Sequence, residues 1–96
     1  MIPSLLDILG KRYAVTMAER TEGDYGECHA DQCTIEVATY QCDEQKRDTL
    51  LHEVLHAVDH EMHCSMSEAQ TRRMATGLLA VLRQNPEFAA FLLAKI

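Results

Sequence analysis

The chain has 96 residues, of which 47% are hydrophobic and 25% are charged, and these ordinary globular values exclude a disordered chain. Its 15 acidic and 9 basic residues give a net charge of −6, which would repel a phosphate backbone and argues against nucleic-acid binding. No apolar stretch approaches the ~20 residues that span a bilayer, and the N-terminus lacks the features of a signal peptide. We therefore expect a single domain over residues 1–96, located in the cytoplasm, with no membrane association and with a protein or peptide as its partner.

The first part of the chain predicts a short helical segment and then a strand. Residues 2–9 are typical of one or two helical turns that begin at Pro3 and end at Gly10. Lys11–Ala18 predicts a strand because it is rich in β-branched and aromatic residues. A turn is expected at residues 22–24, where the sequence reads Glu-Gly-Asp.

The next two segments, residues 25–29 and 33–39, predict a β-hairpin because they flank a short polar turn. On a two-residue turn, Cys28 would lie opposite Cys33, which would permit a disulfide or a metal contact. The chain has 4 cysteines, and without an export signal we expect them to be reduced, buried thiols. A cysteine-built zinc site is the alternative, but Cys42 and Cys64 have no partner nearby in the sequence.

The second half of the chain predicts helices, because no Gly or Pro interrupts it between Asp43 and Gly77. The first helix is expected at Asp43–Met62, and the second begins near Ser65 or Ser67. A third begins at Pro86, with Asn85 as its cap. Strands followed by helices predict an α+β fold, in which a small antiparallel sheet packs on the first helix and one or two further helices.

The central feature of the sequence is the segment from His52 to His56, His-Glu-Val-Leu-His, which has the HExxH pattern of zinc hydrolases. On a helix, His56 lies one turn and about 6 Å beyond His52, so both imidazoles can bind one zinc ion. Glu53 lies on the flank of this pair, where it can act as a general base without occupying a ligand position. The pattern predicts His52 and His56 as metal ligands and Glu53 as the catalytic residue.

The predicted motif helix is amphipathic, with its ionisable residues within about 120° of the helical wheel and its apolar residues opposite them, interrupted only by Glu61. The ionisable side consists of Asp59, His52, His63, His56, His60 and Glu53. A solvated polar face without a metal is the alternative interpretation of this arrangement.

The third zinc ligand has several candidates after the motif, namely Asp59, His60, His63 and Glu68. On an uninterrupted helix, His60 and His63 would lie about 12 Å and about 16 Å along the axis from His52, too far to share a metal with it. Asp59 is better placed to accept the second N–H of His56. Glu68 remains, on the next helix.

The start of that next helix decides whether Glu68 is available. Ser65 with Glu68 matches a capping box that would use the Glu68 carboxylate to cap the helix. Ser67 with Gln70 offers a competing cap that would leave Glu68 free. Both caps remain open from the sequence, and a zinc-binding Glu68 requires the second.

The motif and its surroundings resemble small zincin-type metallopeptidases of the gluzincin kind, which include phage-encoded proteins and the larger ImmA/IrrE family. The resemblance covers most of the chain and is carried by residues 25–28, 34–35, 47–53 and 67–70. In these families a glutamate on the helix after HExxH, often followed by alanine, completes the zinc site, and Glu68-Ala69 matches that pair. The resemblance also implies a strand before the motif helix whose edge holds an extended peptide, here residues 34–39. Compared with the larger family, we expect a minimal form without the N-terminal helical domain and the substrate-binding extension.

These observations predict a minimal zinc metallopeptidase in which His52, His56 and Glu68 bind Zn²⁺ and Glu53 activates a water in the fourth position. The substrate would be a peptide or protein, in the cytoplasm of a bacterial or phage-infected host cell. An additional donor to the oxyanion is expected, and the sequence offers several: Tyr13, Tyr25, Tyr40 and His60.

Two functions of other classes remain open. One is a protein-binding module that is stabilised by zinc and has no protease activity, since a metal can supply much of the stability of so small a chain. The other is a regulatory or toxin-like phage factor that acts by protein contact through its acidic surface.

Overall fold

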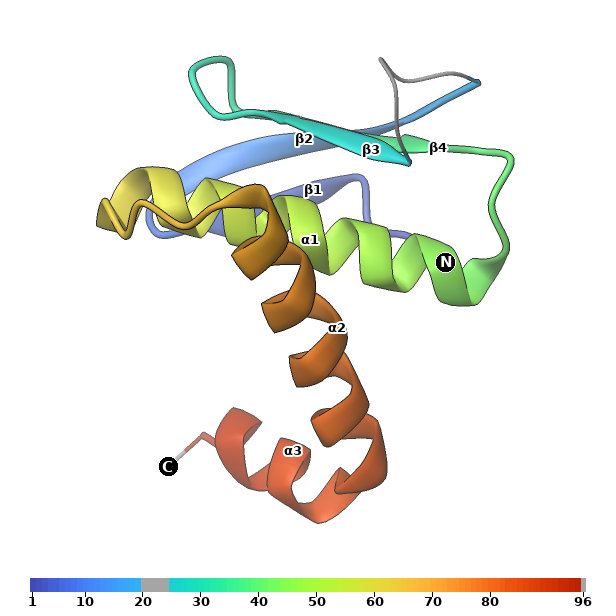
Figure 1. The fold of residues 1–96 in the computed structure, drawn as a ribbon, viewed down its shortest axis with the longest axis vertical. Coiled ribbons are helices and arrows are strands. Elements are labelled where there is room, and N and C mark those ends of the chain that lie inside the picture. The colour runs from blue at the N-terminus through green and yellow to red at the C-terminus, as the bar shows by residue number, and fades with distance from the viewer. Residues whose placement is uncertain (20–24, 96) are drawn as a thin grey trace.

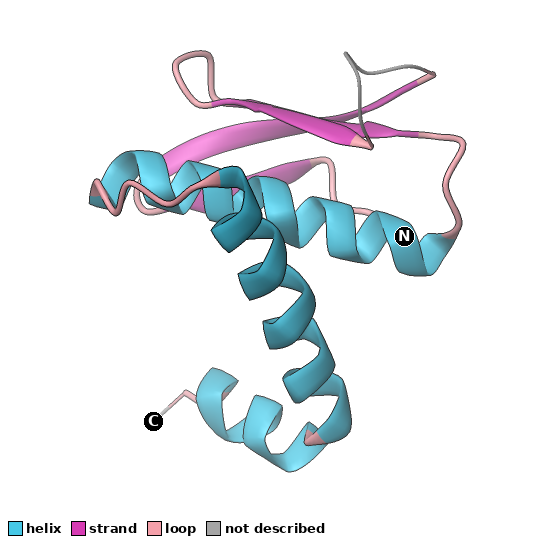
Figure 2. Ribbon diagram, viewed as in Figure 1, coloured by secondary structure: helices cyan, strands magenta, loops and turns pink. Residues whose placement is uncertain are grey.

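The computed structural model of the chain describes residues 1–19 and 25–95. The elements follow in chain order as β1 (Leu5–Ile8), β2 (Lys11–Ala18), β3 (Gly26–His29), β4 (Thr34–Ala38), α1 (Asp43–Met62), α2 (Glu68–Gln84) and α3 (Pro86–Leu93). The strands form one layer, α1 runs along one face of it, and α2 and α3 lie beyond α1 on the side away from the sheet (Figures 1 and 2). The chain is therefore α+β, as the order of strands and helices in the sequence predicts.

The sheet is mixed, and not antiparallel as expected. Its strand order is β1-β2-β4-β3, in which β1 pairs antiparallel with β2, and β3 pairs antiparallel with β4. The central pair, β2 and β4, is parallel, with Val15 opposite Ile35 and Met17 opposite Val37. Periodicity identifies the face that a strand buries but not its neighbour, so the parallel pair could not be foreseen.

The N-terminal segment forms strand β1, and the predicted helical turns are wrong. Leu6 and Ile8 turn toward the core, and β1 pairs with β2 along its whole length, from Leu5 opposite Ala14 to Ile8 opposite Lys11. The connecting residues Leu9 and Gly10 both have positive φ, 49° and 88°, which is the geometry of a tight hairpin turn. Gly10 therefore ends a strand here and not a helix.

The predicted hairpin of β3 and β4 is confirmed, but its turn is longer than expected. His29 pairs with Thr34 and Cys28 pairs with Ile35, so Cys28 does not lie opposite Cys33. Cys33 instead belongs to the turn, where its φ is 53°. The turn predicted at residues 22–24 lies outside the described residues.

The core lies between the sheet and α1. Tyr13, Ile35, Val37 and Ala57 are fully buried there. The partly buried residues that complete it are Ile2, Leu6, Cys28, Cys33, Leu50, Val54 and Val58. The apolar face of α1 therefore covers one face of the sheet, which leaves the ionisable face of α1 for other contacts.

The three predicted helices are confirmed, α1 with the boundaries Asp43–Met62. Hydrogen bonds across α1 and α2 fix their crossing, from Arg83 to Glu44 at 2.6 Å and from Thr76 Oγ1 to Asp48 Oδ1 at 3.0 Å. Asn85 precedes α3, but its side chain donates to Val81 O and does not cap that helix. Within the described part of the chain, no helix combines the length and the hydrophobicity required to cross a membrane.

Candidate metal centre

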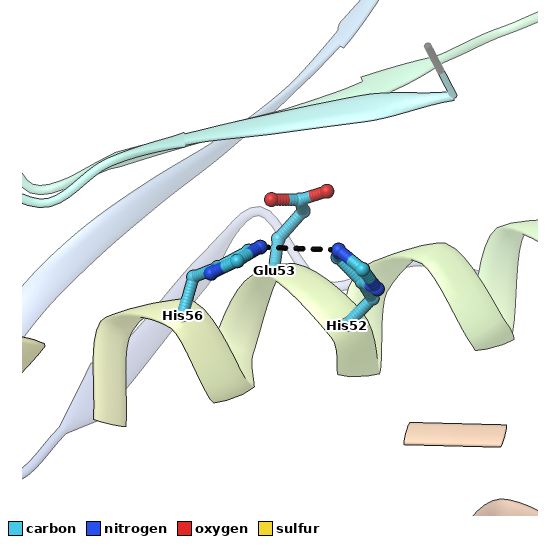
Figure 3. Close-up of side chains that lie close together, drawn as sticks. All are labelled: His52, Glu53 and His56. Carbon is cyan, nitrogen blue, oxygen red and sulfur yellow. Dashed lines mark hydrogen bonds between the residues drawn. The ribbon is translucent and has the colours of Figure 1, made fainter. Parts of the chain in front are cut away.

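The two motif histidines lie one turn apart on α1 and their side chains meet. The Nε2 atoms of His52 and His56 are 3.1 Å apart, and the ring centroids are 4.7 Å apart in an edge-to-face arrangement. Figure 3 shows the two rings turned toward each other, with the Glu53 carboxylate on the side of the sheet. The helix is unbroken from Asp43 to Met62, so the spacing of the motif alone produces this meeting of the rings.

Glu68 completes the cluster from α2. Its Oε1 lies 2.7 Å from His52 Nε2, and its Oε2 lies 2.9 Å from His56 Nε2. The competing cap of α2 explains why the carboxylate is available. Ser67 accepts a hydrogen bond from Gln70 N–H and Gln70 caps Ser67 in return, so the capping box does not use Glu68.

These three side chains fit a zinc ion by their chemistry and by their spacing. Two imidazole nitrogens and one carboxylate form one of the protein donor sets found in catalytic zinc sites. Ligand atoms on a tetrahedral zinc lie about 3.3 Å from one another, given bonds of about 2.05 Å. The Nε2 atoms of His52 and His56 are 3.1 Å apart, close to that value, and each has one of the two Glu68 carboxylate oxygens within 2.9 Å.

Glu53 is buried beside the histidines, with 6% of its surface exposed. One carboxylate oxygen and one nitrogen of each ring lie within 4.8 Å of one another. Strand β3 covers this side chain closely. A Cβ added at Gly26 would meet Thr49 Cγ2 at 2.7 Å, Glu36 O at 2.9 Å and Glu53 Cγ at 3.3 Å. Glycine is therefore required where β3 crosses α1 beside Glu53.

The other residues that follow the motif do not join this cluster. Asp59 uses its carboxylate to accept a hydrogen bond from Met66 N–H at 3.1 Å, which stabilises the connection between α1 and α2. The predicted hydrogen bond from His56 to Asp59 is not among the contacts of the described residues. His60 is exposed, and His63 is the left-handed residue that ends α1.

A cleft of about 670 Å³ contains the cluster. Its floor follows one stripe of α1, one wall is strand β3, and the other wall is α2. The cleft residues on α1 are Gln45, Asp48, Thr49, His52, Glu53, His56, Asp59 and His60, and those on α2 are Glu68, Arg72 and Thr76. The histidines and Glu68 therefore lie near the middle of an open groove.

Strand β3 is the edge strand beside this groove, and the expectation that residues 34–39 form the edge is wrong. Strand β4 is interior, because it pairs with β2 on one side and with β3 on the other. Ala38 N–H donates to Tyr25 O at 2.8 Å, so the antiparallel alternation directs the N–H and C=O groups of Gly26 and Cys28 toward the open edge. The free backbone groups at the cleft therefore belong to β3.

The four cysteines are free thiols and none joins the cluster. Cys28 and Cys33 pack against the core as expected, but Cys42 and Cys64 are exposed. Burial raises the pKa of the Cys28 thiol from 9.0 to about 11, and the nearby Glu53 carboxylate adds to this shift.

The predicted oxyanion donors separate into two groups. Tyr25 and His60 line the cleft, whereas Tyr13 is fully buried in the core and Tyr40 lies outside the cleft lining. Burial also raises the pKa of Tyr13. Tyr25 and His60 remain as candidate donors, and the Tyr25 ring packs against that of Tyr40, with the ring centroids 6.0 Å apart.

A second group of side chains lies on the other face of the sheet. His29 Nε2 is 3.3 Å from Glu27 Oε2 and 3.3 Å from Glu36 Oε1. One ligand atom from each of Glu27, His29 and Glu36 lies within 4.8 Å of the others. It stands apart from the cleft cluster, because side chains at successive positions of β3 point to opposite faces.

No protein-family description matches the sequence, and no curated protein or solved structure is detectably similar to it.

Proposed function

We propose that this chain is a minimal zinc-dependent metallopeptidase, with His52, His56 and Glu68 as the metal ligands. The observation that carries the proposal is the position of Glu68, whose two carboxylate oxygens reach the two Nε2 atoms from a different helix. Three donors of the types that zinc prefers converge beside a buried glutamate in an open cleft. The resemblance to gluzincin peptidases agrees with this assignment.

A zinc ion held by these ligands would lower the pKa of a water molecule to about 7 and polarise the carbonyl of the scissile bond. Glu53 is the general base of the reaction. Its carboxylate accepts a proton as the water oxygen attacks the carbonyl carbon, and it returns the proton to the amide nitrogen when the C–N bond breaks. Burial beside the two imidazoles keeps this carboxylate next to the reacting groups.

The edge of β3 is the proposed binding site for the substrate backbone. An extended peptide that lies in the cleft can pair with the outward N–H and C=O groups of Gly26 and Cys28, as an added strand of the sheet. Such pairing depends on the backbone of the substrate and not on its sequence. It would therefore hold a peptide bond near Glu53 whichever side chains the substrate carries. Tyr25 and His60 are the donors available to the oxyanion.

A zinc-stabilised binding module without protease activity is the second candidate. The observation that favours it is that the proposed ligands join α1 to α2, which would stabilise the helical part of a small chain even without catalysis. Both candidates would act in the cytoplasm of a bacterial or phage-infected cell, where exposed thiols such as Cys42 and Cys64 stay reduced.

A cleavage assay separates the two candidates. The zinc-loaded protein and its Glu53→Gln variant are incubated with a mixture of unstructured peptides, and new termini are identified by mass spectrometry. We expect cleavage by the unaltered protein, and its loss in the variant. The variant Arg47→Gln, which changes an exposed side chain of the same helix outside the cleft lining, should keep the cleavage and serves as the preparation control for contaminating proteases. Equal cleavage by the unaltered protein and Glu53→Gln, or none by either, would reject the peptidase.

A further inference from the structure

The last helix of the chain, α3, is apolar but leaves its apolar side chains in solvent. None of its 8 residues is buried, and among the described elements it packs only against α2. It lies at the end of α2 that is far from the proposed metal centre (Figure 1). An isolated helix of fewer than about 12–15 residues is only marginally stable in water. The single chain therefore gives α3 little of the burial that stabilises a short helix.

The exposed apolar side chains follow the helical repeat on both α2 and α3. They are Met74, Leu78 and Val81 on α2, and Phe88, Phe91, Leu92 and Leu93 on α3. Those on α2 lie within about 60° of the helical wheel, and those on α3, except Leu93, lie within about 100°. A helix face that meets water is normally polar, so these two apolar stripes indicate surfaces that another molecule covers.

The size of this surface fits one half of a dimer interface. The seven side chains are 41–80% exposed, and at roughly 150–200 Å² for a whole side chain they present on the order of 700 Å² of apolar surface. The largest apolar patch of a typical monomer is about 300–600 Å². Each partner of a specific, stable complex buries about 800 Å². The apolar surface of α2 and α3 is therefore comparable with one side of a stable dimer.

The charges at the two ends of α3 make this helix complementary to itself. Glu87 lies in the first turn and Lys95 follows the last, and no ion pair among the described residues uses either. Phe91, which is 76% exposed, is midway between them in the sequence. Where two copies of α3 pack antiparallel about a two-fold axis at Phe91, Glu87 of each copy meets Lys95 of the other. This symmetry of charge favours a second copy of the chain over a partner of another kind.

We propose that α2 and α3 form the interface of a homodimer, in which the two copies of α3 pack antiparallel around Phe91 and the stripes on α2 extend the apolar contact. The cleft residues of α2 are Glu68, Arg72 and Thr76, and they lie on the opposite side of that helix from the stripe. Both clefts therefore stay open in the dimer. The inference does not depend on the proposed peptidase function.

Sedimentation equilibrium of the full chain over a range of micromolar concentrations measures the association. We expect a mass twice that of the single chain, which decreases on dilution. Leu92→Glu should weaken the association at least about tenfold, because it places a carboxylate in the apolar contact. Leu5→Glu is the matched control, since Leu5 on β1 is 55% exposed and Leu92 is 56% exposed. It should leave the dimer intact, and circular dichroism checks that both variants are folded.

A charge exchange tests the antiparallel arrangement. Glu87→Lys and Lys95→Glu each bring like charges together at both ends of the contact, and each should weaken the dimer by up to about fivefold, the range of exposed ion pairs. The double variant Glu87→Lys/Lys95→Glu restores opposite charges and should recover most of the affinity. Failure of the double variant to recover it would reject the antiparallel packing of α3.

Three results would overturn the dimer: a chain that stays monomeric, association of Leu92→Glu equal to that of the unaltered chain, or an equal loss in Leu5→Glu. A monomer that binds phosphatidylcholine vesicles, and no longer binds them as Leu92→Glu, would also overturn it and assign the apolar face to a lipid surface. Assembly beyond two copies would reject the two-fold contact.

Discussion

Glu68 Oε1 lies 2.7 Å from His52 Nε2, although one residue begins α2 and the other is in the middle of α1. The contact depends on how α1 ends. His63 takes a left-handed conformation with φ of 54°, and Ser65 does the same with φ of 59°, so the chain reverses within a few residues. Asp59 holds the reversed segment through Met66 N–H. The connection therefore positions Glu68 against the imidazoles.

The first prediction concerns the metal ligands. Glu68→Ala should weaken zinc affinity by about 10- to 100-fold or more. A loss of that size is expected even for residues that only orient a metal ligand through a hydrogen bond. His60→Ala should leave the affinity unchanged, because His60 lies outside the cluster. Competition with a chromophoric chelator measures both affinities.

A zinc stoichiometry of about one per chain should persist in His29→Ala, which removes the group on the other face of the sheet. Loss of zinc in His60→Ala together with retention in Glu68→Ala would contradict the assignment.

The second prediction concerns Glu53. Glu53→Gln should keep its zinc and lose peptide hydrolysis by about 10²–10⁴-fold, the usual contribution of a general base. Glutamine fills the same buried volume but cannot accept the proton. Elemental analysis and the cleavage rate, measured on the same preparation, check both parts. A variant without zinc would show that Glu53 is itself a ligand.

The third prediction compares two glycines. Gly26→Ala should destabilise the protein by about 1–3 kcal/mol, because the added Cβ would approach Thr49 Cγ2 to 2.7 Å and Glu36 O to 2.9 Å. Gly77→Ala is the control in α2, where a Cβ meets no atom within 4 Å. It should stabilise the protein by about 0.5–1 kcal/mol through the helix propensity of alanine. Urea denaturation of both variants measures the difference, and equal effects would contradict the close approach of β3 to α1.

The fourth prediction concerns Cys28 and pH. Its pKa is raised from 9.0 to about 11, chiefly because burial disfavours the thiolate. In the unfolded chain the thiol ionises near its ordinary value, so above pH 9 the unfolded state binds fewer protons than the folded state. This contribution to stability is therefore lost as the pH rises from about 9 to 11. Cys28→Ala should reduce that loss, as measured by denaturation midpoints at pH 8 and pH 10.

Alkylation provides an independent measurement of the same thiol. At pH 8, Cys28 should react more slowly than the exposed Cys42 and Cys64, since the thiolate is the reactive form. All four cysteines should become modified without a reductant once the chain is unfolded. A pair that resists modification would instead indicate a disulfide.

The fifth prediction concerns Tyr13, which is fully buried and whose hydroxyl has no hydrogen-bond partner among the described residues. Removing that hydroxyl should not destabilise the fold. Tyr13→Phe should raise the free energy of unfolding by about 1 kcal/mol, because an unpaired buried hydroxyl carries a desolvation penalty of that order. Tyr40→Phe, at a ring that is 63% exposed, should change it by less than about 0.5 kcal/mol. A loss of stability in Tyr13→Phe would indicate that the hydroxyl is paired.

The sequence by itself determined the elements whose signal is local. The uninterrupted apolar period and the acidic first turn specify α1 as Asp43–Met62, and the helical repeat then brings His52 and His56 together. The capping box of Ser67 and Gln70 could also be predicted from the sequence, although the competing cap at Ser65 could not be excluded. These features depend on neighbours within about one helical turn, so they are present in the residue order.

Only the tertiary structure decided which segments become neighbours. Residues 5–8 are a strand because β2 supplies its hydrogen-bond partner, and the apolar residues of so short a segment do not distinguish a strand from a helical turn. The parallel pairing of β2 with β4 makes β3 the edge of the sheet. The folding of α2 back over α1 then brings Glu68 to the histidines and Thr76 to Asp48. Such contacts join residues far apart in the chain, and their geometry is set by packing across the whole fold, which no local pattern encodes.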